Sequence, residues 1–209
     1  MASATPPALD RNACLGVLAE GGIILLPVDT LFGLACRADL EPAVERLYHL
    51  KQRPSSKSFA LVFSSLPAVI DHLGVTAGMA GRLARLLPGP ITVVVPAAGS
   101  FTRQFPRWAG TVGVRVPGPS PSSSLLENLP WPLALTSANL SGDAPIESCN
   151  DLPDELAAGI SGHLPGQPVL GQPSTVITMD ETSWSLLREG VFPCDELIRL
   201  LGNPAECPS

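Results

Sequence analysis

Charged residues are scarce in this sequence. Asp, Glu, Lys and Arg account for 15% of the 209 residues, against about 25% in an average soluble domain. Aromatic residues are also few, at 5%, whereas 45% of the residues are hydrophobic. Intrinsically disordered chains combine low hydrophobicity with high net charge, so the composition excludes that class. A chain of this length can bury one substantial core, and we expect a single domain.

Long hydrophobic runs are missing as well. The best candidate, residues 91–98, is far shorter than the roughly 18 residues of a membrane-spanning helix. Residues 1–9 contain neither the apolar segment of a secretory signal nor the arginines of a transit peptide. The five cysteines are widely spaced, without a paired motif. They are Cys14, Cys36, Cys149, Cys194 and Cys207. We therefore expect a cytoplasmic protein with structural thiols and no membrane association.

Positive charge is outnumbered by negative charge. Thirteen Lys and Arg residues face nineteen Asp and Glu residues, which gives a formal net charge of −6. Such a chain is poorly suited to bulk electrostatic binding of nucleic acid, although a local basic cleft is compatible with it.

The motifs of several enzyme classes are absent. The sequence has no glycine-rich loop ending in Lys-Ser/Thr and no dinucleotide-binding glycine fingerprint. No serine carries the glycines of a nucleophile elbow. The three histidines, His49, His72 and His163, lack the spacing of a metal-binding pair. We therefore expect no metal site built from protein side chains.

Short apolar runs alternate with amphipathic segments along the chain. We expect strands at 23–26, 59–63, 91–95, 111–116, 133–135, near Val169, at 175–178 and at 185–188. We expect helices at 10–20, 42–50, 67–73, 77–87, 122–129, 151–158 and 194–201, and a loop at 96–110. This pattern indicates an α/β fold, with a mostly mixed sheet covered by helices on both faces. Residues 10–202 would form the domain, between a flexible N-terminal tail at 1–9 and a C-terminal tail at 203–209.

Four polar clusters follow or end the apolar strands. They are Val28-Asp29-Thr30, Lys51-Gln52-Arg53-Pro54, the segment 136–142, and Pro173-Ser174-Thr175, which is followed by Arg188-Glu189-Gly190. In open α/β sheets, ligands bind outside the ends of the strands. We therefore expect these clusters to converge on one crevice.

Lys51 and Arg53 are the most suggestive cations. They flank the end of a predicted helix, just before Pro54. An arginine fork and a lysine point charge together suit the oxygens of phosphate or carboxylate. Cations also cap the C-terminal ends of ordinary helices, and the spacing alone favours this structural interpretation.

The other polar positions leave similar alternatives open. The segment Thr136-Ser137-Ala138-Asn139-Leu140-Ser141-Gly142 can hydrogen-bond phosphate or ribose, and it can equally be an ordinary Ser/Asn turn. Arg115 lies within an apolar strand, so it must either face solvent on an edge or point into a polar cleft. Arg188 presents the same choice.

Taken in order, these segments resemble the YrdC-like threonylcarbamoyl-AMP synthases. The resemblance spans about residues 10–200. It rests on Leu26-Pro27-Val28-Asp29-Thr30-Leu31-Phe32-Gly33-Leu34, Lys51-Gln52-Arg53-Pro54, Leu87-Pro88-Gly89-Pro90-Ile91-Thr92, Gly113-Val114-Arg115-Val116-Pro117, the segment 136–142, Pro173-Ser174-Thr175-Val176 and Leu187-Arg188-Glu189-Gly190.

The resemblance implies a specific reaction. Family members condense L-threonine, bicarbonate or CO₂, and ATP into threonylcarbamoyl-adenylate and release pyrophosphate. A downstream transferase complex then moves the threonylcarbamoyl group to an adenosine of certain tRNAs. The resemblance also implies a twisted sheet with a large concave, electropositive cleft, in the single-domain form of the family. Mg²⁺ held mainly through the ATP phosphates and weak binding of tRNA complete these expectations.

Residue roles follow from the matching motifs. Lys51 and Arg53 are expected to be catalytic and to meet the triphosphate and the carbamate. ATP would be bound by Lys51, Arg53, Thr136, Ser137, Asn139 and Arg188. Threonine would be bound by Thr30, Phe32, Arg115, Ser137 and Ser174. Because the reactants are anionic, the chemistry needs cations and positioning more than a covalent nucleophile.

Three positions depart from the family pattern. Val28 stands where Thr is common, which removes a hydrogen-bonding group from the expected threonine pocket. Phe32 stands at a position that is commonly Tyr, and Ser58-Phe59 replaces a usual Pro-Leu pair. Two alternatives stay open. One is an RNA-binding module, which the negative charge disfavours; the other is a divergent nucleotide-binding paralogue without synthase activity, to which Val28 points.

Overall fold

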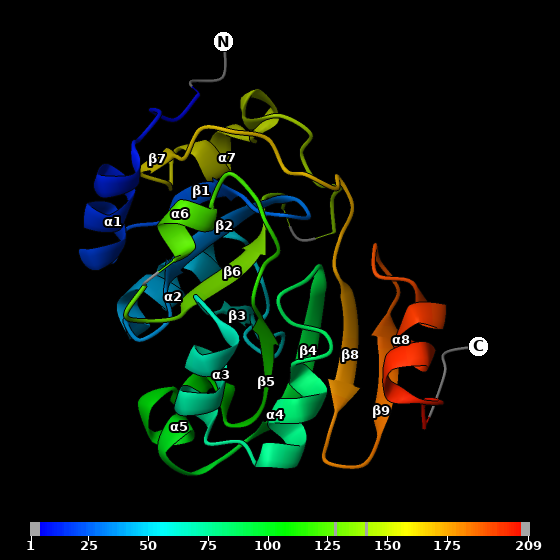
Figure 1. The fold of residues 1–209 in the computed structure, drawn as a ribbon. Helices are drawn as coiled ribbons and strands as arrows, with labels where there is room; N and C mark the ends of the chain where they lie inside the picture. Colours follow the sequence, from blue (N-terminus) through cyan, green and yellow to red (C-terminus); the bar gives the residue numbers. More distant parts are fainter. Residues whose placement is uncertain (1–4, 128, 141, 206–209) are drawn as a thin grey trace.

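One mixed sheet of nine strands organises the chain in the computed structural model, which describes residues 5–127, 129–140 and 142–205. The strands are β1 (Ile24–Pro27), β2 (Phe32–Arg37), β3 (Ala60–Val62), β4 (Ile91–Ala97), β5 (Gly110–Arg115), β6 (Leu133–Ser137), β7 (Gly162–His163), β8 (Thr175–Met179) and β9 (Trp184–Arg188). Their order is β7-β1-β2-β6-β3-β5-β4-β8-β9 (Figure 1). The pairs β1–β7, β3–β5 and β4–β8 are parallel, and the other neighbours are antiparallel. The predicted mixed α/β sheet is confirmed.

Within the described residues the chain forms eight α-helices. They are α1 (Arg11–Ala19), α2 (Glu41–Leu50), α3 (Leu66–Leu73), α4 (Ala77–Leu83), α5 (Gly99–Gln104), α6 (Ser123–Leu126), α7 (Asp154–Ala157) and α8 (Cys194–Leu201). Asp10, Ser65 and Thr76 each accept a hydrogen bond from a backbone N–H group three residues on, which satisfies an otherwise unpaired donor of the first turn. Gly74, with φ of 62°, ends α3 in the left-handed conformation.

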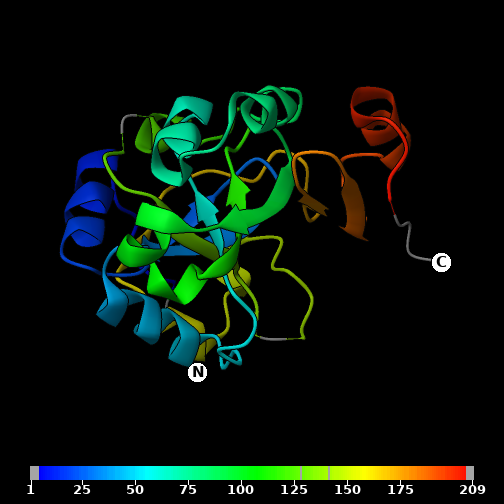
Figure 2. The ribbon, with the colours of Figure 1, turned by 90° about the horizontal axis from the view of Figure 1, so that it is seen from below.

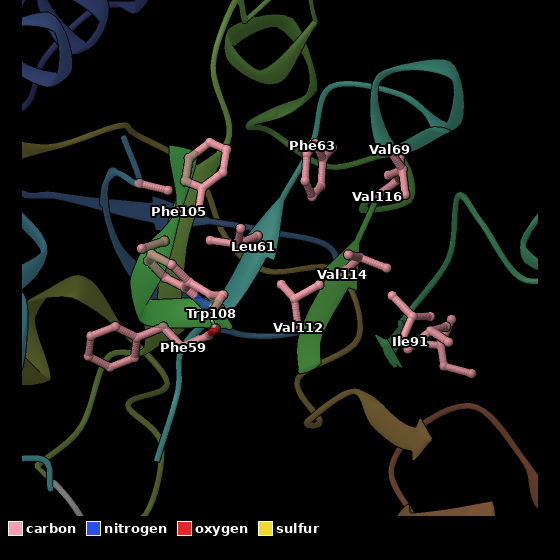
Figure 3. Close-up of a cluster of buried hydrophobic side chains, with 14 of the residues drawn as sticks. Phe59, Leu61, Phe63, Val69, Ile91, Phe105, Trp108, Val112, Val114 and Val116 are labelled. Atoms are coloured by element: carbon pink, nitrogen blue, oxygen red, sulfur yellow. Dashed lines mark hydrogen bonds between the residues drawn. The ribbon is translucent and has the colours of Figure 1, made fainter. Parts of the chain in front are cut away.

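The larger hydrophobic core lies on one face of the sheet. Alternate residues of a strand point to the same face, and Leu61, Val93 and Val114 from three neighbouring strands share one buried cluster. Residues of α2, α3, α4, α5, α7 and α8 complete this cluster. Figure 3 shows its centre, where the Trp108 indole donates a hydrogen bond of 2.8 Å to the carbonyl oxygen of Phe59. The one polar atom of the indole is therefore satisfied within the core.

The opposite face is covered only in part. Ile24 and Leu26 pack there with Leu18 of α1 and Leu125 of α6 in a second buried cluster. Among the described residues, this second cluster draws on β1, β2, β3 and β6, and on none of β4, β5 or β8. Helices thus lie on both faces, as predicted. The face of β4, β5 and β8 opposite the larger core is left without this helical cover.

Several elements differ from the sequence-based expectation. The loop expected at 96–110 contains α5 and a 3-10 helix at Pro106–Trp108, and α5 buries Phe101 in the larger core. The helix expected at 77–87 ends at Leu83 and continues as turns. The strand expected near Val169 is wrong, because Val169 is 60% exposed in a loop with no strand partner among the described residues. A short strand forms earlier instead, at β7.

The described parts of both expected tails make backbone contacts. Ala8 forms a bridge with His163, and the Leu9 N–H donates to the His163 carbonyl oxygen at 2.8 Å. At the other end, the Ala205 N–H donates to the Trp184 carbonyl oxygen at 2.8 Å. Residues 6–9 therefore lie against β7, and Ala205 lies against β9. Residues 1–4 and 206–209 are outside the described residues.

The last two strands and α8 form one end of the molecule, opposite α1 (Figure 2). Val176 pairs with Arg188 while Ile177 pairs with Leu186, which leaves Leu187 as a bulge residue. Directly paired residues share a face. Leu186 therefore stays on the side of the larger core, whereas Arg188 faces the opposite, uncovered side.

Within the described residues, no helix is both long enough and apolar enough to cross a membrane.

Candidate functional site

A pocket of about 500 Å³ lies on the uncovered face of the sheet. Its floor is formed by Thr92 and Val94 of β4 and by Thr111 and Gly113 of β5. These positions alternate with core residues such as Val93 in the same strands. The ligand space thus lies over the face of the sheet. We expected it beyond the strand ends, as in sheets that are covered by helices throughout.

Because Gly113 has no side chain, it leaves space above β5 for the pocket. A Cβ atom at this position would lie 3.2 Å from Cγ2 of Thr92 and 3.8 Å from Cβ of Ala60. Any larger side chain would therefore rise into the pocket, because the opposite face of β5 is filled by the core.

Three arginines surround the pocket: Arg53, Arg115 and Arg188. Burial lowers the pKa of each guanidinium. Arg53 adds to the lowering at Arg188, and Arg188 adds to the lowering at Arg115. The three cations are therefore close enough to repel one another, and an anion bound between them would relieve this repulsion.

Arg115 is held by a buried carboxylate. It is 5% exposed and Asp29 is 3% exposed. Its Nη2 donates to Asp29 Oδ1 and, at 2.7 Å, to Thr30 Oγ1. The other carboxylate oxygen of Asp29 accepts a bond of 2.9 Å from the Gly118 N–H. Because β5 lies between β3 and β4, the edge-strand interpretation of Arg115 is wrong, and the side chain points into the pocket.

Arg188 reaches the pocket from the edge strand β9. Its Nη2 donates to the Ser174 carbonyl oxygen at 2.8 Å, and the Ser174 hydroxyl lies 3.0 Å from the Thr92 hydroxyl on the floor. Gly190 makes this arrangement possible. A Cβ atom on Gly190 would lie 2.3 Å from the Pro173 carbonyl oxygen, so the chain passes there without a side chain.

Arg53 is connected to the end of α2 by Lys51 and Gln52, and the backbone of Gln52 is strained. Gln52 has a φ of 47°, which is uncommon for a residue other than glycine. Arg53 then donates from Nε to the Lys57 carbonyl oxygen at 2.8 Å and from Nη2 to the Ser58 carbonyl oxygen at 3.1 Å. Its guanidinium lies 5.2 Å from the ring centre of Phe59. These contacts hold the side chain along the rim of the pocket.

The end of β6 and the polar turn that follows it line the same pocket through Thr136, Ser137 and Asn139. The Ser137 hydroxyl donates to Asn139 Oδ1 at 2.6 Å, and Asn139 Nδ2 donates to the Asp143 carbonyl oxygen at 2.5 Å. The turn is therefore internally bonded and also faces the ligand space. Ser141, which the sequence motif includes, lies outside the described residues.

Lys51 lies beneath this turn. It is 2% exposed and is not among the residues that line the pocket. Lys51 is the C-cap residue of α2, but its ammonium group does not cap that helix, because Nζ extends to the turn at 137–139. Burial lowers its pKa to about 8, and repulsion by Arg53 adds to this, while Asp143 acts in the opposite direction.

The predicted site residues thus lie around one pocket, except that Lys51 is buried beneath the turn at 137–139 and does not line the pocket. Thr30, Phe32, Arg53, Arg115, Thr136, Ser137, Asn139, Ser174 and Arg188 all line the pocket. Sequence reasoning missed the floor residues Thr92, Thr111 and Gly113 and the wall residue Asp143. Thr111, Gly113 and Arg115 at every second position of β5 were the available signal. Val28 also lines the pocket, although its side chain packs in the smaller core.

The described residues were compared with the requirements of a metal site and of a reactive thiol. Among the described residues, no group of three or more His, Cys, Asp or Glu side chains is placed to hold a metal ion. Burial raises the pKa of Cys14 to about 11 and that of Cys36 to about 12. These thiols therefore stay protonated at neutral pH, which fits a structural role. Cys207 lies outside the described residues.

The chain is similar to a known family and to several named proteins. A family model for Sua5/YciO/YrdC, described as "Telomere recombination", matches residues 16–190. The threonylcarbamoyl-AMP synthase of Vibrio vulnificus (strain YJ016) is 34% identical over 179 residues, covering 83% of this chain and 94% of the relative. The Homo sapiens threonylcarbamoyl-AMP synthase is 34% identical over 154 residues, covering 72% and 55%. The crystal structure of P. abyssi Sua5 complexed with L-threonine matches at a TM-score of 0.82 and 29% identity, covering 92% of this chain and 57% of that one.

Proposed function

This chain belongs to the Sua5/YciO/YrdC family, and from this membership we propose that it is an L-threonylcarbamoyladenylate synthase. The observation that carries the proposal is the convergence of Arg53, Arg115 and Arg188 on one pocket. A chain with a net charge of −6 concentrates three cations there, which suits a ligand with several negative charges. ATP and the carbamate of an amino acid have this character.

The reaction consists of two bond-forming steps. The amine of L-threonine adds to CO₂, or to bicarbonate with loss of water, and becomes a carbamate. A carbamate oxygen then forms a bond to the α-phosphorus of ATP, and the bond from that phosphorus to the bridging oxygen of the β-phosphate breaks. Pyrophosphate leaves with the electron pair. The carbamate and ATP, which react in the second step, are both anionic, so the protein contributes cations and alignment.

The residues divide between the two substrates by their place in the pocket. Arg53 and Arg188 would bind the phosphates, and Thr136, Ser137 and Asn139 would hold the nucleotide and the adenylate. Thr30, Phe32, Arg115 and Ser174 would hold threonine, with the guanidinium of Arg115 facing its carboxylate. Support comes from the bonds that already fix Arg115 and Arg188, because prepositioned donors need little rearrangement when an anion binds.

The remaining expectations form part of the same proposal. Mg²⁺ would be held mainly by the ATP phosphates, as is usual for this ion. Asp143 lines the pocket and would be the side chain that can add a carboxylate ligand. The product would pass, in the cytoplasm, to a transferase complex that acts on tRNA. Weak contact with tRNA is compatible with three pocket arginines.

The proposal is tested by pyrophosphate release from ATP and Mg²⁺ with L-threonine and bicarbonate, each omitted in turn. Release that requires both is expected. In the variant Arg53→Met, kcat/KM should fall by roughly a hundredfold or more, because a cation facing the reacting charge is lost. Arg103→Met is the matched control, since Arg103 lies in α5 and does not line the pocket. Circular dichroism checks that both variants fold.

Three outcomes would contradict the proposal. Undiminished release in Arg53→Met would exclude this pocket as the reaction site. Pyrophosphate release with a different amino acid, or without any amino acid, would favour the divergent paralogue. Val28 would then be the first residue to replace, by the Thr that is common at this position. Tight, salt-dependent binding of tRNA without ATP turnover would favour the RNA-binding module.

A further inference from the structure

The hydrogen bonds of Arg53 all go to an exposed loop. Its Nε and Nη2 donate to the carbonyl oxygens of Lys57 and Ser58, at 2.8 and 3.1 Å. Residues 54–58 are all exposed, so both acceptors lie in a segment that buries no side chain of its own. Segments of this kind open at little cost in free energy. The orientation of Arg53 therefore depends on the residues that anchor the loop.

Phe59 joins this loop to the core. Its side chain is 2% exposed and belongs to the larger buried cluster, and its carbonyl oxygen accepts the bond of 2.8 Å from the Trp108 indole. Phe59 also lines the pocket, and its ring centre lies 5.2 Å from the guanidinium carbon of Arg53. One buried residue thus fixes the end of the loop and supports the cation.

Tyr48 supports Phe59 from helix α2. The two ring centres lie 4.1 Å apart, with the ring planes inclined by 33°, and the guanidinium of Arg107 lies over the Tyr48 ring at 4.9 Å. The Tyr48 hydroxyl donates to the Lys57 carbonyl oxygen at 3.3 Å, and the same oxygen accepts from Arg53 Nε. The two rings therefore hold the loop and the cation together.

We propose that Phe59, supported by Tyr48, is a positioning residue for Arg53: its aromatic face holds the guanidinium at the rim of the pocket, in the orientation that meets an anion. A cation within about 6 Å of a ring centre is attracted by the negative face of the ring. The two carbonyls occupy the Nε–Nη2 edge of Arg53 and the ring occupies one face, so the end that carries Nη1 is available to the ligand. The inference rests on the proposed function only for the identity of that anion.

The first experiment follows Arg53 without a ligand. In protein isotopically labelled at arginine, the Nε–H signal of Arg53 is assigned by its loss in Arg53→Met, and its exchange with water is measured by NMR at mildly acidic pH. The variant Phe59→Leu keeps a buried apolar side chain and removes the aromatic face. Exchange should accelerate roughly fivefold or more, because the attraction of the ring is lost.

Phe101→Leu is the matched control for this measurement. Phe101 is 1% exposed in the same buried cluster and does not line the pocket, so its replacement makes a similar defect in the core. Exchange of the Arg53 Nε–H should be unchanged in this variant. Unchanged exchange in Phe59→Leu, or equal acceleration in both variants, would overturn the proposal.

The second experiment needs no substitution at position 59, so it applies even if Phe59→Leu fails to fold. In the natural chain, the side-chain protons of Arg53 should show nuclear Overhauser contacts with the Phe59 ring, and its ring current should shift them upfield. An arginine that extends freely into solvent shows neither effect. The absence of both effects would overturn the proposal.

The third experiment determines whether Phe59 acts through Arg53. Kd for ATP is measured in the natural chain, Phe59→Leu, Arg53→Met and the double variant. Phe59→Leu alone should raise Kd roughly fivefold. In the Arg53→Met background it should change Kd by less than about twofold, because no guanidinium remains to be positioned.

Each other outcome of this cycle has a defined meaning. An equal loss of affinity in both backgrounds would overturn the proposal, since Phe59 would then act on the nucleotide or on the fold directly. An unchanged Kd in Phe59→Leu would overturn it as well. If ATP does not bind the natural chain, the proposed function fails, while the two ligand-free measurements still decide whether the ring holds Arg53.

Discussion

Asp29 carries the charge that allows Arg115 to sit inside the protein. Both side chains are almost fully buried, and burial lowers the pKa of the guanidinium while Asp29 raises it. A buried charge that loses its partner is far more costly than an exposed one. The pair therefore stabilises the fold and holds Arg115 in the wall of the pocket.

The variant Asp29→Asn tests this dependence. We expect the free energy of unfolding to fall by about 3–5 kcal/mol, since the amide cannot balance the guanidinium charge. Urea denaturation is the measurement. Asp39→Asn is the control, because its pair with Arg37, at 2.6 Å, is partly exposed at 19% and 22% and should be worth less than about 1 kcal/mol. Equal losses in the two variants would contradict the account.

Lys51 makes stability depend on pH in a defined direction. Its pKa in the folded chain, about 8, lies below the ordinary value of 10.5. Between these values the unfolded chain binds more protons than the folded chain, so the free energy of unfolding rises with pH. At about 1.4 kcal/mol per pH unit, this group contributes a rise of about 3 kcal/mol. Below pH 8 the contribution is constant.

Urea unfolding of the natural chain and of Lys51→Met at pH 7.5 and pH 10 isolates this contribution. The natural chain should gain stability relative to the variant as the pH rises, because the other titrating groups are common to both. A difference between the two chains that stays constant with pH would show that Lys51 is not desolvated as described.

At the scale of elements, the position of Arg188 is determined by the bulge in β9 and by the absence of a side chain at Gly190. The bulge at Leu187 lets Leu186 face the core and Arg188 face the pocket. Immediately afterwards, Gly190 passes within van der Waals contact of the Pro173-Ser174 backbone. The position of Arg188 thus depends on a glycine two residues away.

The variant Gly190→Ala should disturb the pocket without removing any functional group. Its Cβ would lie 2.3 Å from the Pro173 carbonyl oxygen, so the strand must shift, at about 1–3 kcal/mol of stability. The bond from Arg188 to Ser174 should break, and KM for ATP should rise. Gly81→Ala in α4 is the control, because nothing lies within 4 Å of the added Cβ. Normal kinetics in Gly190→Ala would contradict this coupling.

Elements were predictable from sequence where local chemistry decided them. Asp10 and the apolar spacing after it predict α1, and the β-branched run at 91–95 predicts β4. The expected strand near Val169 failed because Val169 and Leu170 are apolar residues left exposed in a loop. The helix α5 was missed because Gly99 and Ser100 are weak helix formers, and Phe101 holds the helix through tertiary packing.

At the scale of the whole molecule, charge is distributed unevenly. The chain carries −6 overall. The pocket is lined by Arg53, Arg115 and Arg188, and Asp143 is the one acid among the described residues that line it. A small anion can enter a local positive field of this kind. A long polyanion must also approach a molecule whose net charge is negative.

We therefore expect tRNA to bind weakly and with a shallow dependence on salt. Between 50 and 200 mM KCl, Kd for tRNA should rise by no more than about fortyfold, the value for three neutralised phosphates, whereas a protein that neutralises 6–10 phosphates loses about 10³–10⁵ in affinity. Fluorescence anisotropy of labelled tRNA is the measurement. A steep slope would indicate a basic surface beyond the pocket and would revive the interpretation as an RNA-binding module.

The candidate site was predictable as a set of residues but not as a shape. The polar clusters at 28–30, 51–54, 136–142 and 173–175 do converge. The order in which strands pair, with β6 between β2 and β3, depends on long-range contacts that no local pattern specifies. The burial of Lys51 and the open face of β4 and β5 follow from that order, so sequence reasoning could not reach either one.

The two-sided construction of β4 and β5 has a consequence for changing which amino acid the protein accepts. Side chains on the floor of the pocket and side chains of the core alternate along these strands, so a substitution at one set leaves the other in place. A library that varies only floor positions can therefore reshape the ligand space while the packing beneath it is preserved. Its four sites would be Thr92, Val94, Thr111 and Gly113.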